Sequence, residues 1–336
     1  MSIIDADAHV IETEQTWTFM LEEDRRFAPE VLVSKKNGIE FWRIDDRVVP
    51  NSNLGLNVPE DARDLTDVSS RLGHMDALGI DIQVLYPSLF LRPLTSRSEV
   101  DLALCRGYNR LLAHVWQLGK GRLRWIVLPP LRTMEQAIEE INFGKANGAC
   151  GVFMRGNEGE RLLSDSSLFP LYKEAERLDL PICVHAGGAN PAFRNLVAES
   201  FSGAKLPVIS AFHTLLYNGI PNQFPRLRFG FVEASASWVP YVITDLRRRL
   251  IRDGRPPLSE NPLGDNRMYV ACQTNDDLPY IVQCVGDDNL VIGSDYGHSD
   301  TSSELEALRN LHTTCDLPSG VITKILEDNP RTLYGL

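Results

Sequence analysis

Short apolar runs alternate with amphipathic stretches along almost the whole chain. Eight runs have the length and composition of buried strands, and stretches such as 134–147 and 168–178 carry apolar residues at helical spacing. The predicted strands are Ile3–Val10, Ile82–Tyr86, Leu123–Leu128, Gly151–Arg155, Ile182–His185, Leu227–Glu233, Met268–Gln273 and Leu290–Asp295. Strands that alternate with helices form parallel sheets, and eight such units favour a closed (β/α)8 barrel of the TIM type, an α/β fold.

Two segments depart from this alternation. Residues 12–64 are too long for a plain connection after the first strand, and 38–49 has the pattern of a β-hairpin. We expect an inserted cap over 12–64, with a loop at 51–59. The last residues, 317–336, are expected to form a helix that closes the barrel. The pattern thus predicts one domain over residues 1–336, with the cap after its first strand.

Composition and charge exclude several classes of function. The chain has 336 residues, 43% of them apolar, and a net charge of −11, so we expect no nucleic-acid partner. The sequence contains no basic leader followed by an apolar run, and no apolar run long enough for a membrane helix. Six cysteines form no C-x-x-C motif, which favours reduced thiols and a cytoplasmic location.

Residues that bind metals occur where several predicted strands end. In barrels of this type, active sites lie at the C-terminal ends of the strands. Asp7 and His9 share a face of the first strand, because side chains alternate along a strand. Other candidates at or near strand ends are Glu12, His185, Glu233, Asp295 and His298. A buried carboxylate needs compensation, and a cation at this end of the barrel would supply it.

Several motifs resemble those of the amidohydrolase superfamily. They are Asp-Ala-Asp-Ala-His at 5–9, Val-His-Ala-Gly at 184–187, Trp238, Gly-Ser-Asp-Tyr at 293–296 and Asn-Pro at 329–330. The chain is similar to the branch that includes 2-amino-3-carboxymuconate-semialdehyde decarboxylase and γ-resorcylate decarboxylase. This resemblance implies a metal-dependent TIM barrel, a possible homodimer, and metal ligation by Asp7, His9, His185 and Asp295. Glu233 stands where the decarboxylases carry a catalytic histidine after the sixth strand.

The charge of the site bears on the number of metal ions. Asp7, Glu233 and Asp295 bring three negative charges, and Glu12 adds a fourth if it also ligates. One divalent ion leaves such a site negative, whereas two nearly neutralise it, and His298 is a natural extra ligand for the second. A mixed carboxylate and imidazole set favours Zn, Fe or Mn. One ion and two ions both remain open.

Catalytic roles are expected for Glu233, Asp295 and His298. Glu233 has three alternatives: it ligates the metal, acts as a general base, or orients a ligand histidine. Arg155, at the end of the fourth strand, is a candidate clamp for a substrate carboxylate. Tyr86 is expected to face the substrate pocket. His74, His114, His213 and His312 fall in predicted helices and are expected to be structural.

Three reactions fit this set of residues. The first expectation is hydrolysis of a small, hydrophobic carbonyl or carboxylate compound by a metal-activated water. The alternative is a non-haem diiron monooxygenase, because carboxylate-rich paired-metal sites on related barrels also activate oxygen. The third is metal-dependent decarboxylation, against which the missing histidine counts. A metal-binding subunit without activity of its own is a fourth possibility.

Overall fold

The computed structural model describes residues 2–36, 38–50, 53–188, 201–314 and 316–336. Eight parallel strands lie side by side at its centre in the order β1-β5-β6-β7-β10-β11-β12-β13. They span Ile4–Val10 (β1), Ile82–Pro87 (β5), Leu123–Val127 (β6), Ala149–Arg155 (β7), Ile182–His185 (β10), Phe229–Val232 (β11), Met268–Cys272 (β12) and Leu290–Ile292 (β13). Every predicted strand is confirmed, with small differences at the ends.

The ring of strands closes between its last and first members. The backbone N–H of His9 donates to the carbonyl of Tyr296 over 2.8 Å, and that of Asp295 donates to Asp7 over 2.9 Å. Gly293 permits this approach, since a Cβ atom there would lie 2.3 Å from Cβ of Asp7. The fold is therefore an α/β barrel of the predicted (β/α)8 type, and its closure fixes β1 against the segment that follows β13.

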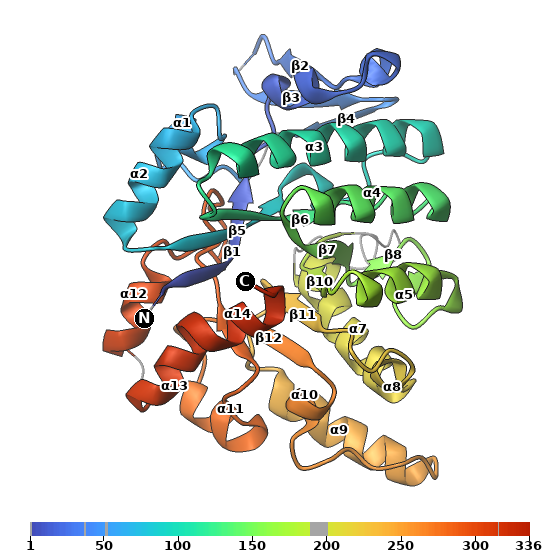
Figure 1. The fold of residues 1–336 in the computed structure, drawn as a ribbon, viewed down its shortest axis with the longest axis vertical. Coiled ribbons are helices and arrows are strands. Elements are labelled where there is room, and N and C mark those ends of the chain that lie inside the picture. The colour runs from blue at the N-terminus through green and yellow to red at the C-terminus, as the bar shows by residue number, and fades with distance from the viewer. Residues whose placement is uncertain (1, 37, 51–52, 189–200, 315) are drawn as a thin grey trace.

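Helices cover the outside of the ring (Figure 1). The α-helices are α1 (Glu60–Arg63), α2 (Val68–Leu78), α3 (Ser98–Leu118), α4 (Met134–Ala146), α5 (Phe169–Arg177), α7 (Leu206–Tyr217), α8 (Ile220–Gln223), α9 (Val239–Arg252), α10 (Pro262–Asp265), α11 (Leu278–Val285), α12 (Ala307–Thr314), α13 (Ser319–Thr323) and α14 (Asn329–Tyr334). The predicted closing helix is confirmed in position, but a π-helical turn, η6 (Lys324–Asp328), separates α13 from α14.

The expected cap lies between β1 and α1. It begins with two 3₁₀ helices, η1 (Glu14–Phe19) and η2 (Glu22–Phe27), and continues as an antiparallel sheet of β2 (Glu30–Val33), β3 (Glu40–Ile44) and β4 (Arg47–Pro50). The predicted hairpin is β3 and β4, whereas the mostly exposed β2 was not predicted. Trp42 of β3 is buried and packs edge-on against Trp17 at 6.2 Å between ring centroids. Of the predicted loop, residues 51 and 52 lie outside the described residues.

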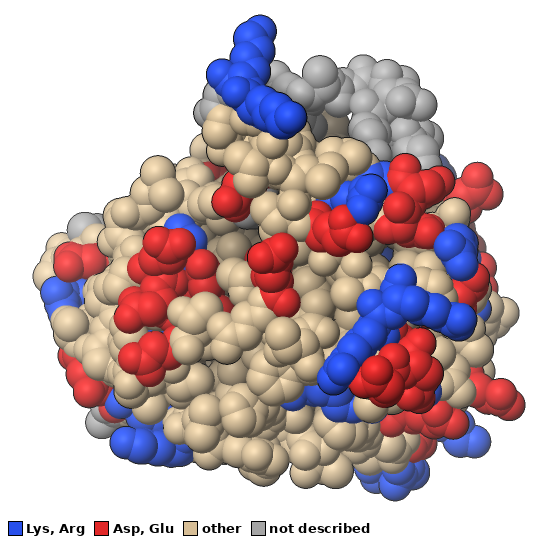
Figure 2. Space-filling model, turned by 90° about the horizontal axis from the view of Figure 1, so that it is seen from above, with Lys and Arg blue, Asp and Glu red and all other residues tan. Residues whose placement is uncertain are grey.

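Short helical and strand segments complete the architecture. They are the 3₁₀ helices η3 (Leu89–Leu91) and η4 (Ser166–Leu168), the π-helical η5 (Phe201–Lys205), and a two-stranded hairpin of β8 (Asn157–Glu158) and β9 (Arg161–Leu162). Among the described residues, no helix is both long and apolar enough to cross a membrane. Four of the five described cysteines are buried, and Cys315 lies outside the described residues. On the face in Figure 2, basic side chains lie in separate groups, most of them next to acidic ones, and one group projects at the top of the view.

A buried polar network holds β1 beneath the closure. Asp5 accepts hydrogen bonds from the backbone and hydroxyl of Ser294 and from Gln83, over 2.6–2.9 Å. Arg71 is fully buried, donates to Gln83 and to the carbonyl of His9, and stacks on the Tyr296 ring at 3.7 Å. The network thus ties α2, β1, β5 and the segment after β13 together directly below His9.

Replacement of Arg71 by methionine tests this network. The variant keeps most of the volume but leaves Gln83 and the carbonyls of His9 and Ala62 without their donor. We expect the free energy of unfolding to fall by about 2–4 kcal/mol. Urea unfolding followed by circular dichroism measures the change. The control is Arg248→Met on the exposed face of α9, and equal stability of the two variants contradicts the role of Arg71.

Candidate metal centre

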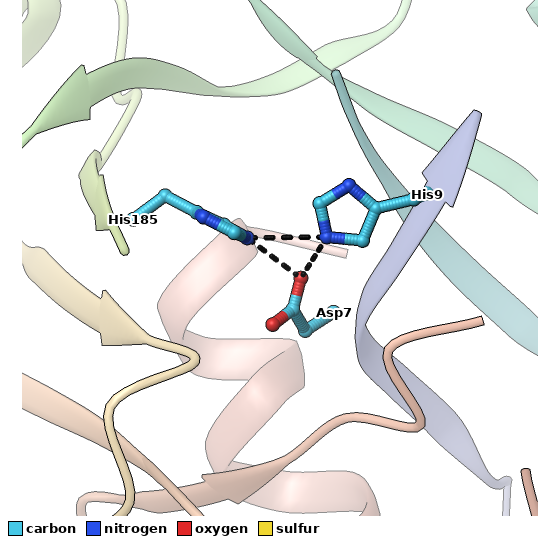
Figure 3. A group of neighbouring side chains, drawn as sticks. All are labelled: Asp7, His9 and His185. Carbon is cyan, nitrogen blue, oxygen red and sulfur yellow. Dashed lines mark hydrogen bonds and ion pairs between the residues drawn. The ribbon is translucent and has the colours of Figure 1, made fainter. Parts of the chain in front are cut away.

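Three side chains converge inside the ring at the C-terminal ends of the strands. Asp7 and His9 come from β1 and His185 from β10, on opposite sides of the barrel, and all three are buried (Figure 3). Nε2 of His9 and Nε2 of His185 lie 3.2 Å apart, and Oδ1 of Asp7 lies 3.4 and 3.3 Å from them. Ligands about 2.0–2.1 Å from a tetrahedral ion are separated by about 3.3–3.4 Å, so these spacings fit a bound divalent cation.

The hydrogen bonds of both imidazoles direct their lone pairs to this point. Nδ1 of His9 lies 3.0 Å from the carbonyl oxygen of Pro87, and Nδ1 of His185 lies 2.8 Å from that of Ala186. A carbonyl only accepts, so Nδ1 carries the proton in each ring, and the Nε2 atoms of the neutral rings are acceptors. Metal-binding histidines commonly donate their other N–H to such a group. Two imidazole lone pairs and a carboxylate oxygen therefore meet where only a positive charge is stable.

The pKa shifts of His185 and Asp7 also indicate that a positive charge is stabilised at this point. Burial disfavours the charged form of His185, yet the Asp7 and Glu233 carboxylates raise its pKa to about 9. Burial also opposes ionisation of Asp7, but His185 and His9 outweigh it and hold the Asp7 pKa well below its usual range. Burial lowers the pKa of His9. A proton on His185 supplies one positive charge at this point, and a divalent cation supplies two.

A second group of side chains adjoins the first. Oδ1 of Asp295 lies 3.3 Å from Nε2 of His9 and 2.8 Å from Nδ1 of His298. Oε2 of Glu233 lies 3.1 Å from Nδ1 of His185. Burial, followed by the charge of Glu233, raises the pKa of Asp295 well above its usual value, and burial does the same for Glu233. The structure thus brings together six of the seven predicted ligands, all except Glu12.

The backbone is strained at two of these carboxylate residues, just after the strands that precede them. Glu233 follows β11 with φ of 59°, and Asp295 follows β13 with φ of 50°. Residues with side chains rarely adopt this left-handed conformation, and such strain occurs mainly at functional sites. It turns both carboxylates inward just beyond their strands. Both residues were predicted as the last residues of strands, and the structure corrects this.

A cavity of about 1420 Å³ adjoins the second group of side chains and is lined by Glu233 and Asp300. It is larger than the 300–1,000 Å³ or so of most ligand pockets. Its walls come from β4 of the cap, from η3, and from the ends of β7, β10 and β11. Aromatic rings of Phe90 and Phe153 line it, together with the guanidinium groups of Arg92, Arg132 and Arg155. Glu233 is the predicted ligand that lines this cavity, so it stands between the buried centre and the substrate space.

Comparison with protein families shows to which family the chain belongs. A family model described as Amidohydrolase matches residues 4–336. The chain belongs to the amidohydrolase family. Enzymes of the amidohydrolase superfamily are metal-dependent, which agrees with the candidate ligand cluster in the barrel.

Similar proteins include decarboxylases and amidohydrolases. The 2-amino-3-carboxymuconate-6-semialdehyde decarboxylase of Dictyostelium discoideum is 22% identical over 241 residues, which are 68% of this chain and 66% of that protein. The structure of an amidohydrolase from Mycobacterium avium subsp. paratuberculosis has a TM-score of 0.84 at 19% identity, covering 100% of this chain and 98% of its own. The structure of 5-carboxyvanillate decarboxylase of Novosphingobium aromaticivorans contains manganese and 4-hydroxy-3-methoxy-5-nitrobenzoic acid. It has a TM-score of 0.66 at 19% identity, covering 80% of this chain and 81% of its own. At these identities the structures share the fold.

Three predicted site residues of this family member have other contacts. The Glu12 carboxylate accepts from the backbone N–H groups of Ser88 and Leu89 over 3.1 and 2.9 Å, and it belongs to none of the ligand clusters found among the described residues. Tyr86 is fully buried, bonds Tyr334 over 2.9 Å, and is not part of the cavity wall. Arg155 does line the cavity, paired with Glu158 and donating to the carbonyl of Phe90. The geometry thus places Glu12 outside the candidate ligand clusters and Tyr86 outside the cavity wall.

Asp300 and Ser88 are the residues that sequence reasoning missed. Asp300 joins Glu233, Asp295 and His298 in one group of possible ligands, and Ser88 lies 2.8 Å from Nε2 of His298. Asp300 follows His298 by two residues, so a search for carboxylates next to the predicted ligands would have included it. Ser88 carries no comparable signal in the sequence.

Metal binding to this centre is expected to release protons. His185, Glu233 and Asp295 have raised pKa values and hold protons that a cation displaces. Binding therefore weakens as the pH falls below these pKa values. We expect the rise in Tm caused by added Mn²⁺ or Zn²⁺ to increase between about pH 6 and pH 8. Differential scanning calorimetry measures it, and an increment independent of pH contradicts the expectation.

A second prediction concerns Glu12. Burial raises its pKa to about 7. If its task is to hold the loop at Ser88 and Leu89, Glu12→Gln retains the wild-type metal content, whereas His185→Ala loses metal. The variant amide faces a backbone N–H, so the free energy of unfolding falls by about 1–3 kcal/mol. Elemental analysis and urea unfolding check both effects. Loss of metal in Glu12→Gln would contradict this prediction and show that Glu12 is a metal ligand.

Proposed function

We propose that this amidohydrolase-family chain is a divalent-metal-dependent decarboxylase of small, largely apolar carboxylic acids. The observation that carries the proposal is a cluster of metal ligands at the end of a cavity with aromatic and arginine walls. The cavity accommodates an apolar body next to Phe90 and Phe153, and its arginines favour an anionic group. Both decarboxylases described above add support, and the one with manganese holds a substituted benzoic acid.

The ligands of the metal would be Asp7, His9, His185 and Asp295. A bound divalent ion would polarise oxygen atoms of the substrate and stabilise the negative charge that develops when carbon dioxide leaves. Arg155 lies on the cavity wall and would orient the substrate; its partner Glu158 keeps the guanidinium in place. Hydrogen bonds from Nδ1 to backbone carbonyls hold both imidazoles in the required orientation.

The reaction also needs a proton at the carbon that loses the carboxylate. The bond between that carbon and the carboxylate breaks, its electron pair stays on the carbon, and a proton from an acid takes the vacated position. Asp295 is a buried carboxyl group at this point, whereas Glu233 is part-buried and lines the cavity. Glu233 would supply this proton and so take the place of the histidine that the related decarboxylases carry after the sixth strand.

Hydrolysis, the first expectation from the sequence, is the second candidate. It is supported by Glu233 itself, because a carboxylate beside a metal accepts a proton from an attacking water. The monooxygenase alternative is favoured by the number of carboxylates near the centre, since di-iron proteins use such carboxylate-rich ligand sets. The three reactions consume different reactants. All three candidate functions include a small-molecule substrate, a single domain over residues 1–336 and a homodimer.

Product analysis of the metal-loaded protein tests the proposal. We expect carbon dioxide from at least one member of a panel of hydroxybenzoic and enoic acids, with kcat/KM at least about 100-fold lower in His185→Ala. Arg155→Gln is expected to raise KM more than it lowers kcat, because it positions the substrate. Arg248→Met is the unaffected control.

The same assays separate the alternatives. Cleavage of esters, lactones or amides without release of carbon dioxide overturns decarboxylation in favour of hydrolysis. Oxygen consumption that depends on a reductant and on iron favours the monooxygenase. Full activity in His185→Ala contradicts all three, because each places the metal on His185.

A further inference from the structure

We propose a second divalent-cation site, formed by Glu233, Asp295, His298 and Asp300 and sharing Asp295 with the first. It rests on the metal centre of the proposed function and deepens it. Each of the four residues offers one ligand atom, and these atoms all lie within 4.8 Å of one another. Glu233 comes from the end of β11, and the other three come from the segment after β13. The two sites together contain four carboxylates and three imidazoles.

The hydrogen bonds of His298 identify which ring nitrogen faces the proposed ion. The hydroxyl of Ser88 donates to the carbonyl of Val10 over 2.9 Å, so its oxygen accepts from Nε2 of His298 over 2.8 Å. Nε2 therefore carries the proton, and Nδ1 of the neutral ring presents a lone pair. That lone pair lies 2.8 Å from Oδ1 of Asp295. Two acceptors this close repel each other unless Asp295 holds a proton or a metal cation lies next to both.

Buried polar atoms without partners provide an independent observation. Asp295 is 2% exposed and His298 1% exposed. Among the described residues, neither oxygen of Asp295 has a hydrogen-bond partner, nor does Nδ1 of His298 or Oε2 of Glu233. Buried carboxylate oxygens without hydrogen bonds cost several kcal/mol in general, so native proteins rarely contain them without an ion. All four atoms belong to residues of the proposed second site.

Charge favours a second ion as well. With the histidines neutral, Asp7, Glu233, Asp295 and Asp300 carry four negative charges when ionised, and one divalent ion leaves a net charge of about −2. Two divalent ions neutralise the set. Carboxylates with one imidazole suit Mn²⁺, Fe²⁺ or Zn²⁺. Asn53 donates to Oδ2 of Asp300 over 2.8 Å and thereby orients that carboxylate.

Metal stoichiometry tests the second site directly. The wild-type protein is stripped with a chelator, loaded with excess Mn²⁺, desalted and analysed for manganese. We expect about two ions per chain, and about one in His298→Ala and in Asp300→Asn. Electron paramagnetic resonance should show coupled Mn²⁺ ions in the wild type and isolated Mn²⁺ in both variants. Asp316→Asn, at an exposed position, is the matched control with two ions.

The possible outcomes are distinct. About one ion in the wild type, unchanged in both variants, overturns the second site and leaves the proposed function intact. No bound manganese in the wild type overturns the metal centre of the proposed function as well. If His298→Ala does not fold, Asp300→Asn decides, because Asp300 lies on the segment after β13 and takes no part in the closure of the barrel.

Discussion

The site depends on one constraint: the negative charge and the imidazole lone pairs inside the closed barrel need a positive charge beside them. Asp7, His9 and His185 are buried and aim acceptor atoms at one point. No rearrangement of hydrogen bonds resolves this, because both Nδ1 atoms already donate to backbone carbonyls. A proton relieves part of the repulsion, and a divalent cation relieves more. The metal chemistry of this family member thus follows from its electrostatics.

The barrel provides the rigidity that such a cluster needs. Closure between β1 and the segment after β13 places Asp7 beside Asp295, and Gly293 allows the two backbones to approach. Below them, Asp5 and Arg71 tie β1 to its neighbours through fully buried hydrogen bonds. Ligands held from opposite sides of the ring cannot move apart without breaking these contacts, so the arrangement is preorganised.

Much of the fold and part of the site could be predicted from the sequence. Buried parallel strands leave apolar runs, and the rule that active sites lie at strand ends selects His9, His185 and Asp295. The roles of Glu12 and Tyr86 could not be predicted, because their partners, Ser88 and Tyr334, lie far away along the chain. Strand β2 is only four residues long and mostly exposed, so its short Val-Leu-Val run could not be recognised as a buried strand. The tautomers of the histidines likewise depend on carbonyl groups placed by the tertiary structure.

Anomalous diffraction from crystals of the metal-loaded protein, recorded at the absorption edge of the bound metal, tests the central claim most directly. The account predicts a peak within bonding distance of Nε2 of His9, Nε2 of His185 and Oδ1 of Asp7. A metal peak elsewhere, with these three atoms bridged by protons alone, contradicts it.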